Sequence, residues 1–112
     1  KSEQYSFCQE ATKEPTAVGN GLKNRRSVWS INTEPCLEAH FAVFPRALIR
    51  PCILAGSKEG DLILDPFYGA GTVGIVAKEL GRRCVGIEIN PEYVKIARKR
   101  TSLVLASLIP AV

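Results

Sequence analysis

The chain has 112 residues, of which 46% are hydrophobic and 23% are charged, and its formal net charge is +4. This length fits one domain, and the composition allows an ordinary hydrophobic core and argues against global disorder. A weakly basic chain is compatible with a polyanionic partner without requiring one.

The first part of the chain is predicted to be a polar arm or linker. Residues 1–23 contain Pro15 and the turn-like sequence Gly19-Asn20-Gly21, and they show no sustained apolar period. The next segment, residues 27–31, is rich in strand-forming residues and predicts a short strand.

The remainder, residues 24–112, is predicted to be one α/β domain. A helical pattern begins at Pro45 and ends at Gly56, with Pro51 inside it as a bend or a delayed start. An alternation follows: strands at 61–65 and 84–89, a helix at 72–80 capped by Gly81, and a second helix starting at Asn90-Pro91-Glu92. Strands separated by a helix imply parallel pairing and a right-handed crossover.

The termini and the cysteines are typical of a soluble cytosolic protein with no membrane association. The polar N-terminus does not resemble a signal peptide, and the apolar residues 103–112 are far fewer than the roughly 20 of a membrane span. The four cysteines lie far apart in sequence, which gives no zinc or redox pair, and we expect them to be reduced. Because the chain begins at Lys1 and contains no Met, we expect it to be a piece of a longer protein.

The loop between the first strand of this alternation and its helix is the strongest candidate for a ligand site. Ligands of open α/β sheets bind beyond the carboxyl ends of the strands. Gly69 and Gly71 would let the backbone come close to a ligand. Glu88 ends the second strand, a common position for a carboxylate that accepts ribose hydroxyl protons. These residues predict a nucleotide-type cofactor.

Two kinds of cofactor are compatible with the glycines, and a glycine turn without a ligand is the third reading. Gly69, Gly71 and Gly74 match the G-x-G-x-x-G pattern of dinucleotide sites. Asp65, however, would disfavour a pyrophosphate and would favour a ligand ammonium, as in an amino-acid moiety. We therefore favour a methionine-type cofactor over a dinucleotide. A P-loop is excluded because the chain has no Gly-Lys-Ser/Thr sequence.

The loop and its neighbours resemble DNA methyltransferases that modify exocyclic amino groups. Their cofactor motif is similar to Asp65-Pro66-Phe67-Tyr68-Gly69-Ala70-Gly71-Thr72, and the segment that packs around the methionine end of the cofactor is similar to His40-Phe41-Ala42-Val43-Phe44-Pro45. Residues 25–29, 81–83 and 86–93 also resemble family segments, so the resemblance covers residues 24–100. It implies a partial Rossmann-like fold, the cofactor S-adenosylmethionine, and methyl transfer to adenine N6 or cytosine N4 in duplex DNA.

The order of the motifs resembles the beta group of this family, in which the catalytic half precedes the cofactor half. The catalytic motif of that group, Asp/Ser/Asn-Pro-Pro-Tyr/Phe/Trp, is absent from this chain, so no residue is assigned a catalytic role. The resemblance implies a C-terminal cofactor part that does not methylate DNA alone, with residues 1–23 as an arm or a remnant of the upstream target-recognition region. A stand-alone cofactor-binding or assembly domain and a nicotinamide-dependent oxidoreductase fragment are the alternatives.

The resemblance also implies partners and a setting. The partners are duplex DNA, the missing N-terminal catalytic half and, because an isolated half exposes its sheet, a second copy of the chain as a homodimer. The setting is the cytoplasm of a bacterial or phage-infected cell, in a restriction-modification system.

The resemblance assigns cofactor contacts to nine residues: His40, Phe41, Ala42, Asp65, Phe67, Gly69, Gly71, Thr72 and Glu88. Asp65 would contact the methionine amino group, or would be a turn aspartate. Phe67 would pack against the methionine chain, or would be a core aromatic. Thr72 would bind the cofactor or cap the helix, and Glu88 would hold the ribose. No metal site is expected, because His40 has no Cys or carboxylate at metal spacing.

Basic residues gather in two places. Lys23, Arg25 and Arg26 form the best candidate for contact with DNA phosphates, with a solvated loop as the alternative. The second cluster, between residues 95 and 100, is predicted to lie in the last turn of a helix, where cations offset the helix dipole.

Overall fold

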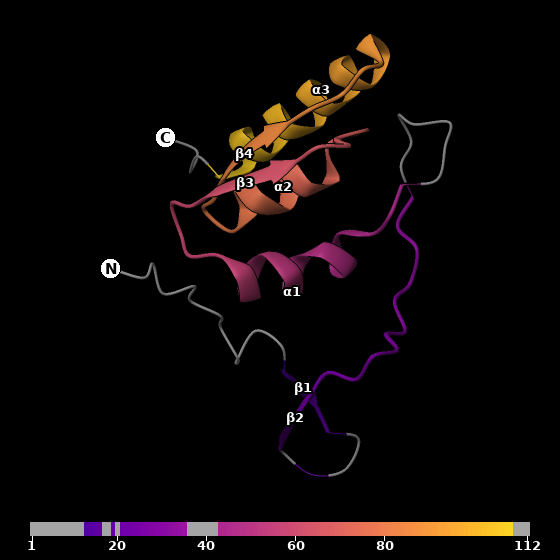
Figure 1. The fold of residues 1–112 in the computed structure, drawn as a ribbon, viewed down its shortest axis with the longest axis vertical. Coiled ribbons are helices and arrows are strands. Elements are labelled where there is room, and N and C mark those ends of the chain that lie inside the picture. The colour runs from indigo at the N-terminus through magenta and orange to yellow at the C-terminus, as the bar shows by residue number, and fades with distance from the viewer. Residues whose placement is uncertain (1–12, 17–18, 20, 36–42, 109–112) are drawn as a thin grey trace.

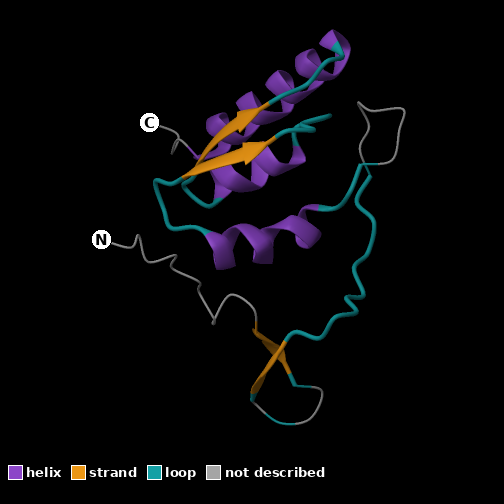
Figure 2. Cartoon of the chain, viewed as in Figure 1, coloured by secondary structure: helices purple, strands orange, loops and turns teal. Residues whose placement is uncertain are grey.

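The chain folds into a small hairpin and an α/β unit (Figure 1, Figure 2). The computed structural model describes residues 13–16, 19, 21–35 and 43–108, without the side chains of residues 105–108. The elements in chain order are β1 (Lys13–Pro15), β2 (Leu22–Asn24), α1 (Arg46–Gly56), β3 (Leu62–Asp65), α2 (Thr72–Glu79), β4 (Arg83–Gly86) and α3 (Pro91–Leu108).

The parallel pairing predicted from the alternating pattern is confirmed. β3 and β4 pair in parallel, with Leu62 opposite Arg83 and Asp65 opposite Gly86, and α2 is the crossover helix between them. One further bond, from the Ile87 N–H to the Asp65 carbonyl at 2.9 Å, continues the pairing beyond the strands. The predicted α/β fold with parallel strands is therefore correct, although β4 ends at Gly86 and is shorter than predicted.

The core lies between α2 and its neighbours. α2 contacts α1, α3 and both strands of the parallel pair, and Figure 1 shows it beside the sheet. Val76 and Ala77 of α2 are fully buried and pack with Ile53 of α1. Ile63 of β3 and Cys84 of β4 pack against this cluster from the sheet. The apolar period that predicted α2 thus also marks the residues that it buries.

The opposite face of the parallel pair is apolar and exposed. Side chains alternate along a strand, so the neighbours of Ile63 and Cys84 lie on the face away from α2. This open sheet face consists of Leu62 (57% exposed), Leu64 (63%), Val85 (47%) and Ile87 (57%). Contiguous exposed apolar residues of this kind mark an interaction surface.

Gly81 and Arg82 fix the passage from α2 to β4. Gly81 has a φ of +74°. Its N–H donates to the Lys78 carbonyl, and the Arg82 N–H donates to the Ala77 carbonyl. These bonds form a Schellman motif, which confirms the predicted cap at Gly81. The Arg82 guanidinium also donates to the Ser57 carbonyl at 2.8 Å and thereby ties the start of β4 to the end of α1.

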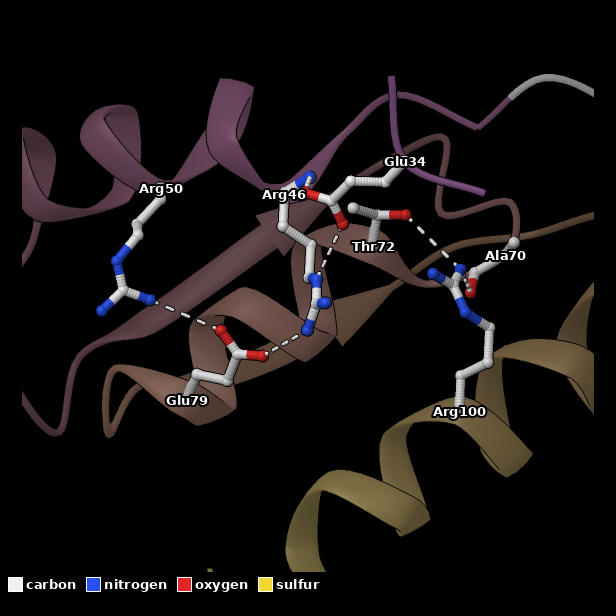
Figure 3. Close-up of polar contacts among 7 residues, drawn as sticks. All are labelled: Glu34, Arg46, Arg50, Ala70, Thr72, Glu79 and Arg100. Carbon is white, nitrogen blue, oxygen red and sulfur yellow. Dashed lines mark hydrogen bonds and ion pairs between the residues drawn. The ribbon is translucent and has the colours of Figure 1, made fainter. Parts of the chain in front are cut away.

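Charged side chains join α1 to α2 and to the loop that precedes α1 (Figure 3). Arg46 donates to Glu34 at 3.0 Å and to Glu79 at 2.9 Å. Arg50, one helical turn later, lies 3.4 Å from the second Glu79 oxygen. The hydrogen bond from Arg46 holds the pKa of the Glu34 carboxyl below its ordinary value.

The helix boundaries depart from prediction in two places. Pro45 has extended backbone angles and precedes α1 as its N-cap, while Pro51 lies inside the helix. α3 starts as predicted, since Asn90 accepts the Glu92 N–H at 3.0 Å, but it continues to Leu108. The basic cluster at residues 95–100 therefore lies in the middle of α3, and its predicted position in the last turn is wrong. Across the described residues, no helix has the length and apolarity needed to cross a bilayer.

The N-terminal region contains a hairpin that the sequence did not predict. β1 and β2 pair antiparallel, from Lys13 opposite Asn24 to Pro15 opposite Leu22. The turn predicted around Gly19 connects them, and the boundary drawn between residues 23 and 24 falls inside β2. Residues 27–31 form no strand, so that prediction is wrong.

The core assignment predicts a difference between two valines. Replacing Val76 by Ala removes buried methyl groups and leaves a cavity, so the free energy of unfolding should fall by about 2 kcal/mol. Val28→Ala, at a side chain that is 86% exposed, is the control and should change it by less than about 0.5 kcal/mol. Urea unfolding of both variants tests this, and equal effects would contradict the assignment.

Candidate functional site

The loop after β3 lies at the carboxyl ends of both parallel strands. The Asp65 carboxylate accepts the Phe67 N–H at 3.0 Å, which turns the chain out of β3. The Tyr68 N–H then donates to the Ile87 carbonyl, and the Gly71 N–H donates to the Tyr68 carbonyl, both at 2.9 Å. The loop is therefore attached to the end of β4 and closes as a turn before α2.

Glu88 joins the loop to the end of β4. One carboxylate oxygen accepts the Gly69 N–H at 2.7 Å, and the other accepts the Asn90 N–H at 2.8 Å. The bonds from Asn90 and Gly69 lower the pKa of the Glu88 carboxyl. The structure thus brings together Gly69 and Glu88, two predicted site residues that are 19 positions apart, and leaves Glu88 partly exposed.

The two glycines of the loop have different surroundings. Gly69 has a φ of +51° and nothing closer than 4.0 Å to the position of an added Cβ, so a ligand can approach its backbone. Gly71 has a φ of +80°, and an added Cβ would stand 2.9 Å from the Cβ of Ala97 in α3. Gly71 therefore allows α3 to pack closely against the loop, whereas Gly69 faces open space.

Tyr68 is a packing residue of the site that the sequence reasoning missed. Its ring lies against Gly86 of β4 and its hydroxyl against Gly74 of α2, so closely that a Cβ at either glycine would clash with it. Burial raises the pKa of Tyr68 to about 12. Gly74, the third glycine of the dinucleotide-like pattern, therefore has a packing explanation within the chain.

The mouth of the site carries two exposed apolar side chains. Phe67 is 89% exposed, so its reading as a core aromatic is wrong. Ile89, which follows Glu88 directly, is 98% exposed and was missed by the sequence reasoning. The sequence offered one indication of this site residue, because an isoleucine directly follows the carboxylate that ends the predicted strand. Isolated exposed hydrophobic residues are common, but Ile89 directly follows Glu88 in the sequence and Phe67 lies in the loop whose Gly69 N–H donates to Glu88.

Thr72 is buried and does not cap α2. It is 3% exposed and is the first residue of the helix, whose N-cap is Gly71 and has no side-chain cap. The reading of Thr72 as a helix cap is therefore wrong. Arg100 of α3 lies 3.4 Å from the Thr72 hydroxyl and donates to the Ala70 carbonyl at 2.6 Å (Figure 3). Arg100 was not among the predicted site residues.

A cavity of about 240 Å³ lies beside the loop, between Tyr68, Glu88 and the α3 residues Arg98 and Thr101. Small-molecule sites usually have volumes of about 300–1,000 Å³. The hollow between α1 and β3, which includes Asp65, has a volume of about 310 Å³ and falls within this range.

The candidate DNA contacts are engaged in different ways. Lys23 lies 3.4 Å from a Glu14 carboxylate oxygen. The Arg25 guanidinium lies over the Trp29 ring, 5.4 Å from its centroid. The Trp29 indole N–H donates to the Arg26 carbonyl at 2.6 Å, while the Arg26 side chain is exposed. The candidate cofactor residues His40, Phe41 and Ala42 lie outside the described residues.

Comparison with known proteins shows that the chain is similar to DNA methyltransferases. A family described as DNA methylase matches residues 1–99. Three relatives, each named a type II methyltransferase, are similar over 89% of this chain: M.XycI of Xanthomonas campestris pv. cyanopsidis (56% identical), M.Cfr9I of Citrobacter freundii (57%) and M.SmaI of Serratia marcescens (54%). The chain spans about a third of their length, 33%, 33% and 35%.

Solved structures show the same likeness. The M1.HpyAVI–SAM complex matches with a TM-score of 0.56 and 32% identity, over 69% of this chain and 42% of that one. A putative DNA modification methylase from Thermus thermophilus, complexed with S-adenosyl-L-methionine, matches with a TM-score of 0.53 and 39% identity, over 55% of this chain and 25% of that one. The cytosine-N4-specific PvuII DNA methyltransferase matches with a TM-score of 0.53 and 31% identity, over 61% of this chain and 27% of that one.

The packing of Tyr68 predicts a coupled pair of substitutions. Gly86→Ala places a methyl group against the ring and should lower the free energy of unfolding by about 2 kcal/mol. In a Tyr68→Ala background the same substitution should cost far less, which a double-mutant cycle measures. Gly56→Ala, where an added Cβ meets open space, is the control and should be neutral or stabilising. Additive effects of Gly86→Ala and Tyr68→Ala would refute the contact.

The lowered pKa of Glu88 predicts a pH dependence. Because its folded-state pKa lies below the ordinary 4.5, the ionised carboxylate stabilises the fold above about pH 4.5, and this contribution is lost as the pH falls through the folded-state value. Melting curves of the wild type and of Glu88→Gln should therefore differ at pH 7 and converge as the pH falls below the folded-state pKa of Glu88. A difference in melting temperature that does not shrink on acidification would contradict the carboxylate bonds.

Proposed function

Because this chain belongs to the DNA methylase family, we propose that it is the S-adenosylmethionine-binding part of a site-specific DNA methyltransferase. The whole enzyme would transfer a methyl group from the cofactor to adenine N6 or cytosine N4 of a flipped base. The observation that carries the proposal is the Glu88 carboxylate, which receives the Gly69 N–H at the carboxyl ends of two parallel strands. The names of the relatives and the cofactor in two of the similar solved structures support it.

The residues around Glu88 fit the chemistry of S-adenosylmethionine. Ribose hydroxyls need an acceptor, and each Glu88 oxygen retains acceptor capacity beside the backbone N–H that it holds. The Asp65 carboxylate likewise retains capacity for the methionine ammonium. Exposed Phe67 and Ile89 offer apolar surface to the methionine chain and to the adenine ring.

The chain itself would bind and orient the cofactor. When bound, S-adenosylmethionine supplies an electrophilic methyl group on a sulfonium sulfur, and the task of the protein is then mainly positioning. The groups that hold the target amino nitrogen would come from another part of the enzyme, since the Pro-Pro-aromatic motif is absent from this sequence. We keep His40, Phe41 and Ala42 as proposed contacts to the methionine end, and Gly71 and Thr72 as residues that shape the loop.

The open sheet face is the surface that we assign to the catalytic part. Its four exposed side chains, together with a hollow of about 310 Å³ between α1 and β3 that includes Ile49 and Ile63, would be covered by that part of the enzyme. A second copy of the chain would compete for the same surface in the isolated protein.

Duplex DNA is the proposed substrate, and the cytoplasm of a bacterial or phage-infected cell is therefore the proposed compartment. Phosphate contacts from the N-terminal region would be electrostatic. The exposed Arg26 is the first candidate to test, because Lys23 is already beside Glu14 and Arg25 lies over Trp29.

Calorimetric titration with S-adenosylhomocysteine tests the cofactor assignment. The chain should bind it saturably, and Glu88→Ala should weaken binding by about tenfold or more, because the variant loses hydrogen bonds to a charged acceptor, which are stronger than neutral ones. The control, Glu14→Ala, removes a carboxylate of the separate hairpin and should leave the affinity unchanged. Binding of NAD without binding of S-adenosylhomocysteine would overturn the assignment.

A further inference from the structure

Arg100 connects α3 to the backbone of the glycine loop (Figure 3). Its Nη1 atom donates to the Ala70 carbonyl at 2.6 Å, and the same atom lies 3.4 Å from the Thr72 hydroxyl. Ala70 is 7% exposed and Thr72 is 3% exposed. One guanidinium therefore serves two buried groups on either side of Gly71.

The loop needs such a donor because regular secondary structure does not supply one. Gly69 and Gly71, on either side of Ala70, both have left-handed φ angles of +51° and +80°. The first helical bond of α2 runs from the Ile75 N–H to the Gly71 carbonyl, so the Ala70 carbonyl stands one residue ahead of that ladder. A buried carbonyl requires a hydrogen-bond partner, and a charged donor makes a stronger bond than a neutral one.

The reach of Arg100 follows from the packing of α3. Ala97 lies against Gly71, and an added Cβ at that glycine would come within 2.9 Å of the Ala97 Cβ. Residues three apart on a helix share a face, so Arg100 leaves α3 on the side that faces the loop. Lys95, two positions before Ala97, has an exposed side chain that pairs with Glu92.

We infer that Arg100 is a positioning residue for cofactor binding. It holds the peptide between Ala70 and Gly71, and thereby keeps the Gly69 N–H directed toward Glu88, without touching the cofactor itself. This inference rests on the proposed function and extends it to a residue outside the glycine loop and the strand ends.

The test uses Arg100→Gln and Arg100→Lys in the full chain, with Lys95→Gln, an exposed cation of the same helix, as the matched control. Amide hydrogen exchange of Gly69 and Gly71 is measured by NMR without ligand, and the dissociation constant for S-adenosylhomocysteine is measured by calorimetry. In Arg100→Gln both amides should exchange about tenfold faster and the dissociation constant should rise about tenfold. Arg100→Lys keeps the charge but loses the fork of guanidinium donors. Its exchange rates and dissociation constant should therefore lie between those of the wild type and of Arg100→Gln. Lys95→Gln should match the wild type.

The two readouts separate failure of this inference from failure of the proposed function. Wild-type exchange rates and affinity in Arg100→Gln would overturn the role of Arg100 while the proposed function stands. Absence of S-adenosylhomocysteine binding by the wild-type chain would overturn the proposed function, and with it the role of Arg100 in cofactor binding. Should Arg100→Gln fail to fold, Arg100→Lys decides, because wild-type exchange and affinity in that variant would overturn the inference.

Discussion

The packing of Tyr68 against Gly74 and Gly86 sets how closely the glycine loop, α2 and β4 approach one another. The ring occupies the space that a side chain at either glycine would need, and Gly71 admits α3 at Ala97 in the same way. With these contacts made, the loop is fixed by atoms of its own chain on one side. Gly69 is left on the more open side, where an added Cβ would meet nothing closer than 4.0 Å.

Much of this arrangement is encoded locally and was therefore predictable. The apolar period of α2, the cap at Gly81 and the N-cap at Asn90 each depend on a few neighbouring residues, and all three are confirmed. The alternation of strand and helix implied the parallel pair, which the structure confirms. The resemblance to DNA methyltransferases is confirmed by the family match over residues 1–99, because the motif residues and their order are specific to that family.

The contacts that were missed join residues far apart in sequence. Nothing in the spacing of the glycines indicates that Gly74 accommodates the Tyr68 hydroxyl, or that Arg100, 30 positions away, bonds to Ala70. The strand predicted at residues 27–31 failed for a related reason: strand propensity is realised only beside a pairing partner, and the neighbouring backbone pairs instead as β1 with β2. Phe67 was ambiguous because an apolar residue type does not reveal whether its loop turns inward.

The β3–α2–β4 crossover also bears on how such a protein reaches its native state. Its parallel pairing joins strands separated by a single short helix, so the sequence separation of its contacts is small for a parallel sheet. Folding rates fall as contacts become less local. This unit can therefore form early, before more distant segments arrive, and would then display Leu62, Leu64, Val85 and Ile87 as a transient hydrophobic surface. Chaperone dependence and aggregation during synthesis would be governed by how soon that surface is covered.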